Sequence, residues 1–163
     1  MISTKIPFVI FKSFFNGSIR IKLDWESLIS EQVTINMSFF EELENPSSWY
    51  LPWYLNDVDE EVSYLAPNAR QLTLADIPKA INHLNSKRRD KIQELLSRFI
   101  NSTQPVQLVI ATYALPDGKH LIMDGNHRSS ALILAGVKAR LMVFEMFGPL
   151  DPELLPDLRL WKD

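Results

Sequence analysis

One short segment of the 163-residue chain gathers side chains that could bind an anion and move a proton. Its sequence is Asp124-Gly125-Asn126-His127-Arg128, and it is followed by Ser129 and Ser130, whose hydroxyls could add contacts to a phosphate. A strand ending at Asp124 and a helix beginning after it would place the segment at a helix N-terminus. Unpaired backbone N–H groups and the helix dipole attract negative charge there. The segment therefore predicts a site for a phosphate or another anion.

The residue types in this segment suit such a site. Gly125 lets the chain turn closely past a ligand because it has no Cβ, and Asn126 is predicted to cap the helix. Arg128 carries a permanent, fork-shaped charge that matches phosphate or carboxylate oxygens, and His127 could contact the anion or shuttle a proton. Asp124 could hold a cation, accept a hydroxyl proton or pair with Arg128. In the alternative interpretation, the Asp124–Arg128 pair and the capping asparagine only stabilise a turn.

Hydrophobic patterning predicts the elements that position this segment. They follow one another as strand, turn, strand, helix and strand, at Val106–Leu115, Pro116–Gly118, His120–Asp124, Ser129–Ala135 and Arg140–Phe147. Gly136 is predicted to end the helix as its C-terminal glycine.

Two further helices are predicted upstream, at residues 76–84 and 86–101. Asp76 is expected to cap the first, and an amphipathic stripe of apolar residues marks the second. The start of the second helix carries Lys87, Arg88, Arg89 and Lys91, whose charge opposes the helix dipole. These residues either form a solvated surface or are neutralised by an anion, which would be a ligand or the acidic stretch of residues 41–61.

The N-terminal part is predicted to be β-structure. Asn16-Gly17 is a favoured hairpin turn, and it separates Phe8–Phe15 from the alternating segment Ser18–Trp25. Residues 33–39 alternate in the same way. We therefore expect an antiparallel β-meander within residues 1–40.

Residues 41–75 are predicted to be an irregular connection with one short helix, because they contain three prolines and many acidic residues. Four aromatic residues lie close together in it, namely Trp49, Tyr50, Trp53 and Tyr54. One interpretation is that they fill the gap between the meander and the rest of the domain. The other is that they form a lid or a stacking surface for a planar ligand.

Composition and charge narrow the classes of function. The chain has no cysteine and only three histidines, which excludes disulfides and thiolate metal sites. The net charge is −3, and residues 23–69 contain no basic residue, which argues against nucleic acid as a partner. No stretch is long and apolar enough for a membrane span. We expect one soluble, cytoplasmic domain over residues 1–163.

The stretch from Leu74 to Phe147, with its motif Asp124-Gly125-Asn126-His127-Arg128, resembles the ParB/sulfiredoxin superfamily. In that superfamily a G-x-x-R or D-G-x-H-R signature opens a helix and binds nucleotide phosphates. The resemblance covers a little under half of the chain. It implies an α+β fold with a small mixed sheet: a ParB-like core at residues 76–147, preceded by the meander and the connection and followed by an irregular tail at 148–163.

The resemblance also implies a cofactor and a set of site residues. The cofactor would be a nucleotide triphosphate or diphosphate, with ATP favoured, together with Mg²⁺. Asp124 would be the metal ligand, and Asp124 and His127 would be the catalytic residues. The phosphates would be contacted by the residues that follow Asp124, namely Gly125, Asn126, His127, Arg128, Ser129 and Ser130.

Members of this superfamily differ in activity, so the resemblance does not fix one. Sulfiredoxins use a cysteine where this chain has Asn126, so their reaction is excluded. ParB partitioning proteins carry a DNA-binding region after the signature, for which too little chain follows Arg128, and the acidic surface argues against a ParB-like nuclease. Kinases related to free-serine kinases share the D-G-x-H-R signature and use carboxylates as base and metal partner. Asp124 fits one of those carboxylates, and the second is left open between Glu94, Glu145 and residues 57–61.

Two functional hypotheses follow from the resemblance. In the first, the chain is a nucleotide-binding phosphotransferase or nucleotide hydrolase that acts on a small molecule. In the second, it is a non-catalytic module that docks a protein partner through its N-terminal half, using Trp49, Tyr50, Trp53 and Tyr54. A homodimer through the edge of the predicted meander is a further hypothesis.

Overall fold

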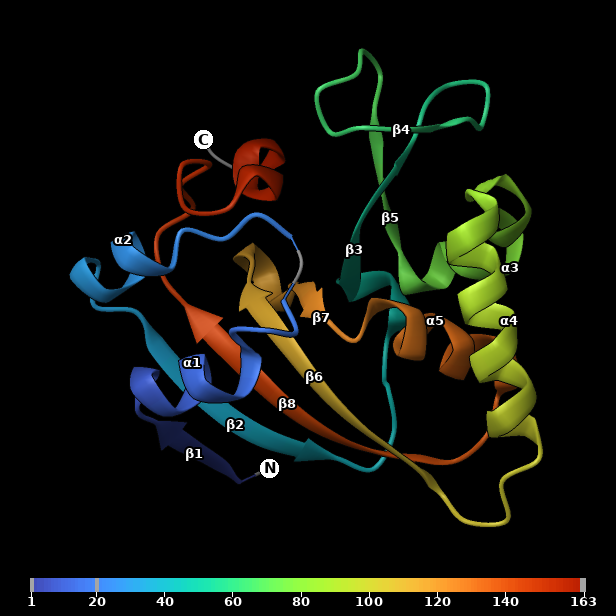
Figure 1. Ribbon diagram of the computed structural model, residues 1–163, viewed down its shortest axis with the longest axis horizontal. Coiled ribbons are helices and arrows are strands. Elements are labelled where there is room, and N and C mark those ends of the chain that lie inside the picture. Colours follow the sequence, from blue (N-terminus) through green and yellow to red (C-terminus); the bar gives the residue numbers. More distant parts are fainter. Residues whose placement is uncertain (1, 20, 162–163) are drawn as a thin grey trace.

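A mixed β-sheet runs through the molecule (Figure 1). The computed structural model describes residues 2–19 and 21–161. Eight strands of this part of the chain form the sheet in the order β1-β2-β8-β6-β7-β3-β4, and β5 pairs with β3. Parallel pairing joins β6 to β8 and β3 to β7, whereas the other pairs are antiparallel. The α+β class with a mixed sheet is thus confirmed.

The strands are β1 (Ser3–Ile6), β2 (Thr34–Phe40), β3 (Trp49–Leu55), β4 (Glu61–Val62), β5 (Arg70–Thr73), β6 (Val106–Ala114), β7 (His120–Asp124) and β8 (Ala139–Phe147). The α-helices are α1 (Phe8–Phe15), α2 (Trp25–Ser30), α3 (Ile77–Ala80), α4 (Ser86–Ile100) and α5 (Asn126–Ala135). Short 3₁₀ turns are η1 (Pro46–Ser48), η2 (Leu74–Asp76), η3 (Ile81–His83), η4 (Pro116–Gly118) and η5 (Pro156–Leu160).

Two apolar clusters pack on the two faces of the sheet, because successive strand residues point to opposite faces. Along β7, Ile122 belongs to one cluster, whereas its neighbours Leu121 and Met123 belong to the other. The first cluster packs against α3, α4 and α5, and the second against α1, α2 and the C-terminal segment. Figure 1 shows these two groups of helices on either side of the central strands.

The predicted β-meander is wrong over residues 8–30. Among the described residues up to 40, β1 and β2 are the only strands and pair antiparallel, and the segment between them forms α1 and α2. A short apolar run such as Phe8–Phe15 fits a buried helix as well as a strand. Helix formation places Phe11 and Phe15 one turn apart in the core, with ring centroids 4.9 Å apart. Met1, Arg20 of the predicted hairpin arm and the last two residues of the predicted tail lie outside the described residues.

The prediction of an irregular connection at residues 41–75 is also wrong in part. The segment contains three strands, and β3 lies well inside the sheet, between β7 and β4 in the strand order and paired with β5. Trp49, Leu51, Trp53 and Leu55 alternate along β3 and enter the first core cluster. Pro52 weakens the sequence pattern expected of a strand, because proline has no backbone N–H to donate to a neighbouring strand.

The elements of the C-terminal half match their predictions more closely. Helix α4, strands β6 to β8 and helix α5 form where the sequence places them, and Gly136 ends α5 in the left-handed conformation. The predicted helix at residues 76–84 is a series of short helical turns. Asp76 is at the N-cap position of α3, but its side chain makes no capping hydrogen bond to that helix. Its carboxylate instead accepts a hydrogen bond from the backbone N–H of Thr73 at 2.7 Å, as part of a capping box on η2.

The segment 148–161 is mostly irregular, as predicted, apart from η5. It packs Leu154, Leu155 and Leu158 into the second core cluster and thereby brings Asp157 against β3. Within the described part of the chain, no helix combines the length and the apolar composition that a membrane span requires.

Candidate functional site

The predicted anion segment lies at the junction of β7 and α5. Gly125 is the N-cap of α5, with a φ of 97° that favours glycine, so the prediction that Asn126 caps the helix is wrong. Asn126 is instead the first helical residue, three positions earlier than the predicted start at Ser129. The backbone N–H of Ser129 donates to the carbonyl of Gly125 at 2.8 Å and closes the first turn. The preceding N–H groups have no acceptor within the helix.

The charged residues of the segment lie close to one another. Arg128 Nη2 in α5 donates to Oδ2 of Asp124, the last residue of β7, at 3.2 Å, and both side chains are partly exposed. The ring of His127 packs against the indole of Trp53, with centroids 5.2 Å apart. The segment therefore presents a carboxylate, a guanidinium and an imidazole near the start of α5.

Two buried polar atoms of the first turn lack a hydrogen-bond partner among the described residues. They are Oδ1 of Asn126 and Oγ of Ser129. Ser130 differs, because its hydroxyl donates to the carbonyl of Asn126 at 2.8 Å. A buried polar atom without a partner carries a desolvation cost that a ligand can remove by supplying the missing hydrogen bond.

Glu61 neutralises Arg88 in the basic cluster of α4. Arg88 Nη1 forms an ion pair with Glu61 Oε1, and the guanidinium lies over the Trp53 ring, 4.6 Å from its centroid. The interpretation that the acidic stretch compensates this cluster is thus confirmed for Arg88. Burial lowers the pKa of Arg88. Trp53 links this ion pair to the predicted anion segment, because it contacts both Arg88 and His127.

Three of the four clustered aromatic residues belong to the core. Trp49, Trp53 and Tyr54 are 3%, 4% and 2% exposed, and Tyr50 packs against Trp161 at 4.8 Å between ring centroids. Trp49 and Trp53 thus fill the interior beneath α3, α4 and α5, whereas the meander that the cluster was predicted to pack against does not form. A partner could reach little of these side chains without disturbing β3.

Three of the candidate second carboxylates, Glu145, Glu94 and Glu61, interact with side chains other than those of the predicted anion segment. Glu145 accepts hydrogen bonds from His120 Nδ1 and from Thr112 at 3.0 Å, near the start of β7, whereas Asp124 is at its end. The His120 ring stacks on Trp49 at 4.3 Å. Glu94 pairs with Arg98 at 2.8 Å on the exposed side of α4. In the 57–61 stretch, Glu61 is the residue that pairs with Arg88 and so connects to the Trp53 indole.

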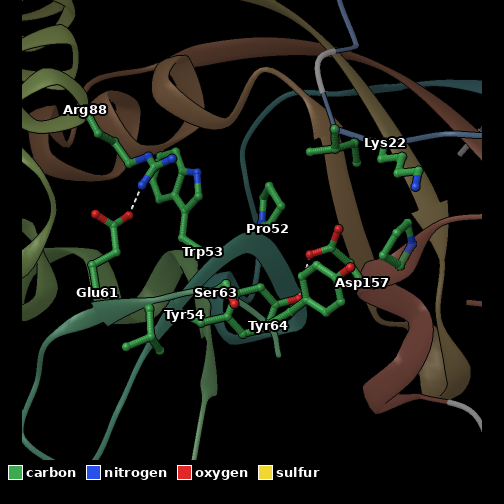
Figure 2. Close-up of a pocket in the computed structure, with 12 residues that line it drawn as sticks. Lys22, Pro52, Trp53, Tyr54, Glu61, Ser63, Tyr64, Arg88 and Asp157 are labelled. Atoms are coloured by element: carbon green, nitrogen blue, oxygen red, sulfur yellow. Dashed lines mark hydrogen bonds and ion pairs between the residues drawn. The ribbon is translucent and has the colours of Figure 1, made fainter. Parts of the chain in front are cut away.

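A cavity of about 500 Å³ lies on the other side of Trp53 (Figure 2). The residues that line it come from five separate parts of the chain, at positions 21–22, 52–54, 61–64, 88 and 156–157. Figure 2 shows the Arg88–Glu61 pair at one end and Asp157 at the other. The hydroxyl of Tyr54 donates to Asp157 Oδ2 at 2.6 Å. Burial raises the pKa of Asp157 and, together with the Asp157 charge, that of Tyr54.

Sequence reasoning missed this cavity. None of the residues from Asp124 to Ser130 lines it, and no local motif connects its five segments. The only sequence signal was the density of aromatic residues around Trp53 and Tyr54 of β3. The cavity exists because the C-terminal segment packs against the β3–β4 hairpin.

No cluster of three or more metal-binding side chains occurs within residues 2–19 and 21–161. Comparisons with protein-family models, with curated proteins and with solved structures found no match. A functional assignment therefore depends on the residues and their geometry.

Proposed function

We propose that the start of α5 binds the phosphates of a nucleotide, with ATP as the favoured ligand. The observation that carries this proposal is the buried, unpartnered hydroxyl of Ser129 in the first turn of a ten-residue helix. That hydroxyl can donate to a phosphate oxygen beside the N–H groups of the same turn. The left-handed Gly125 keeps the approach free of a Cβ.

Arg128 is the residue that would neutralise most of the phosphate charge. Its guanidinium already lies next to Gly125, because a Cβ built on that glycine would be 3.5 Å from Arg128 Nη2. With five N–H donors, the guanidinium can keep one bond to Asp124 and direct others at phosphate oxygens. His127, beside it, would contribute a further contact from its imidazole.

Mg²⁺ fits the same end of α5. The Asp124 carboxylate and the unpartnered Oδ1 of Asn126 are hard oxygen ligands of the kind that this ion uses, and Mg²⁺ is often held by one or two such groups together with substrate phosphates. When bound, the ion would offset the negative charge of the phosphates. Asp124 and Asn126 are the residues that would hold it.

The reaction that suits these groups is phosphoryl transfer to a small hydroxyl compound. As the acceptor oxygen forms its bond to the γ-phosphorus, the bond from that phosphorus to the bridging oxygen breaks and ADP leaves. The Asp124 carboxylate would accept the acceptor's proton, and Arg128 and the helix N–H groups would stabilise the charge on the phosphate. Transfer to water in place of the acceptor would be nucleotide hydrolysis.

Thermal denaturation with added nucleotides tests the proposal. Wild type and Arg128→Ala are heated with ATP, ADP, CTP, GTP, AMP or inorganic phosphate, each with and without Mg²⁺. A ligand at 100 times its Kd stabilises the native state by about 2.7 kcal/mol. At roughly 2–4 °C per kcal/mol for a domain of this size, we expect a rise in Tm of about 5–10 °C that Arg128→Ala removes.

Arg98→Ala is the matched control, since it removes an arginine from the exposed side of α4, away from the segment. It should keep the full rise in Tm. The proposal fails if no nucleotide stabilises the wild type, or if Arg128→Ala keeps the same rise. Where a nucleotide binds, incubation with Mg²⁺ and a panel of hydroxyl metabolites that includes serine distinguishes a phosphotransferase or hydrolase from a binding module, because only the first two consume the nucleotide.

A further inference from the structure

The Asp157 end of the cavity holds a buried carboxylate that pairs with no cationic side chain among residues 2–19 and 21–161. Asp157 is 7% exposed, and its hydrogen bonds come from the Tyr54 hydroxyl and from its own backbone N–H. No lysine, arginine or histidine among the described residues forms an ion pair with it. Lys22 lines the same cavity but does not pair with Asp157. Buried carboxylates are usually paired, because an uncompensated charge is costly away from water.

Aromatic rings surround this carboxylate. The rings of Tyr54 and Tyr64 lie 6.5 Å apart, and both residues line the cavity next to Asp157, as Figure 2 shows. Aromatic faces attract cations through their quadrupole, and a carboxylate beside such rings is a favourable place for an ammonium group. The rest of the wall is largely apolar and includes Pro52 and Val62.

We propose that this cavity binds a small molecule with a protonated amine and an apolar or aromatic body, with the amine on Asp157 and the body between Tyr64 and Trp53. The volume of about 500 Å³ suits a small organic ligand. The inference is independent of nucleotide binding, because no residue from Asp124 to Ser130 lines the cavity.

The opposite end of the cavity does not compete for the amine. Glu61 there already accepts from Arg88 and, at 2.8 Å, from the backbone N–H of Asn85. The guanidinium of Arg88 would also repel a second cation. Asp157 is therefore the carboxylate of this cavity that is available to an ammonium group.

Titration of three amines against the ¹⁵N-labelled protein, without nucleotide, tests the inference. The amines are benzylamine, phenethylamine and cyclohexylamine, each compared with the alcohol of the same body. All three amines are protonated near neutral pH, so each pair differs in charge but little in shape. We expect at least one amine to bind saturably and about tenfold more tightly than its alcohol. The shifted amide resonances should belong to residues 52–54, 61–64 and 156–157.

The variants Asp157→Asn and Glu153→Gln each remove one negative charge from the C-terminal segment. Comparing them separates a specific contact of the amine with Asp157 from a general attraction of the amine to negative charge. Asp157→Asn keeps an acceptor for the Tyr54 hydroxyl but removes the charge, and it should abolish the preference for the amine. Glu153→Gln removes one exposed carboxylate of the same segment outside the cavity, and it should change nothing. The inference is overturned if no amine binds better than its alcohol, if the shifted resonances lie elsewhere, or if Asp157→Asn keeps the preference. If Asp157→Asn does not fold, two wild-type results test the inference instead. They are the preference for the amine over its alcohol and the positions of the residues whose amide resonances shift.

Discussion

Helix α4 carries two Arg–Glu pairs that differ in burial, and this difference allows a quantitative prediction. The Arg88–Glu61 pair has side chains that are 25% and 16% exposed, whereas those of the Arg98–Glu94 pair are 69% and 55% exposed. An exposed pair in high dielectric contributes little, and a pair shielded from water is coupled more strongly. We therefore expect a larger coupling free energy for Arg88–Glu61.

The expected magnitudes follow from the environments of the two pairs. The coupling for Arg98–Glu94 should be about 0.3–0.5 kcal/mol, as for exposed pairs one helical turn apart. For Arg88–Glu61 it should be about 1–2 kcal/mol, which is below the 3–5 kcal/mol cost of breaking a fully buried pair because water still reaches both groups. Arg88→Met alone also loses the contact with Trp53, worth about 0.5–1 kcal/mol.

Two double-mutant cycles measure these values. One uses Arg88→Met, Glu61→Gln and both together, and the other uses Arg98→Met, Glu94→Gln and both together. Urea unfolding followed by circular dichroism gives the free energy of unfolding of each variant, at low salt and at 1 M NaCl. Because the Debye length falls to about 3 Å at 1 M, the exposed coupling should vanish while most of the inner coupling remains.

A coupling for Arg88–Glu61 no larger than that for Arg98–Glu94 would refute this reasoning. Such a result would mean that partial burial does not strengthen the Arg88–Glu61 pair, and that other contacts, such as the hydrogen bond from the Asn85 N–H to Glu61, hold the β3–β4 hairpin against α4. A coupling that disappears at high salt in both pairs would lead to the same conclusion, since it would show that water screens the inner pair as fully as the outer one.

Two further predictions concern Gly125 and Asp157. Gly125→Ala should lower the free energy of unfolding by about 1–2 kcal/mol in urea, because a residue with a Cβ is strained at a φ of 97° although the space around it is adequate; an unchanged value would contradict the left-handed cap. Burial raises the pKa of Asp157, so the folded state binds a proton on this carboxyl more tightly than the unfolded state does. The contribution of Asp157 to the free energy of unfolding is therefore most favourable at low pH and is lost as the pH rises through the raised pKa. The Tm of the wild type relative to Asp157→Asn should therefore fall as the pH rises above about 4, the usual range of an aspartate, and a difference that stays constant or rises would contradict the desolvation of this carboxylate.

The unit from β6 to β8 illustrates what local sequence can specify. Turn residues at Pro116–Gly118, a glycine after Asp124 and another after Ala135 mark its boundaries, and each acts through the conformation of a few neighbouring residues. The amphipathic stripe of α4 is equally local, since one helix face contains all of its apolar contacts. These elements were predicted because their signals do not depend on distant parts of the chain.

Elements whose signals were ambiguous needed their neighbours. Phe8–Phe15 could be a strand or a helix, and packing of Phe11 beneath α2 and the second core cluster selects the helix. Strand β3 contains Pro52, and it forms within the sheet because β7 and β5 flank it on both sides. In both cases the local pattern did not distinguish the alternatives, and tertiary contacts decided between them.

The sequence by itself determined the α+β class, the strand–turn–helix junction at Asp124-Gly125-Asn126 and the types of side chain available there. Only the tertiary structure decided that Glu61 neutralises Arg88 over Trp53 and that Asp157 is buried against Tyr54. The physical reason is distance along the chain. A turn or a cap is fixed by neighbouring residues, whereas a contact such as that between Tyr54 and Asp157 exists only after segments about a hundred positions apart have packed on the same sheet.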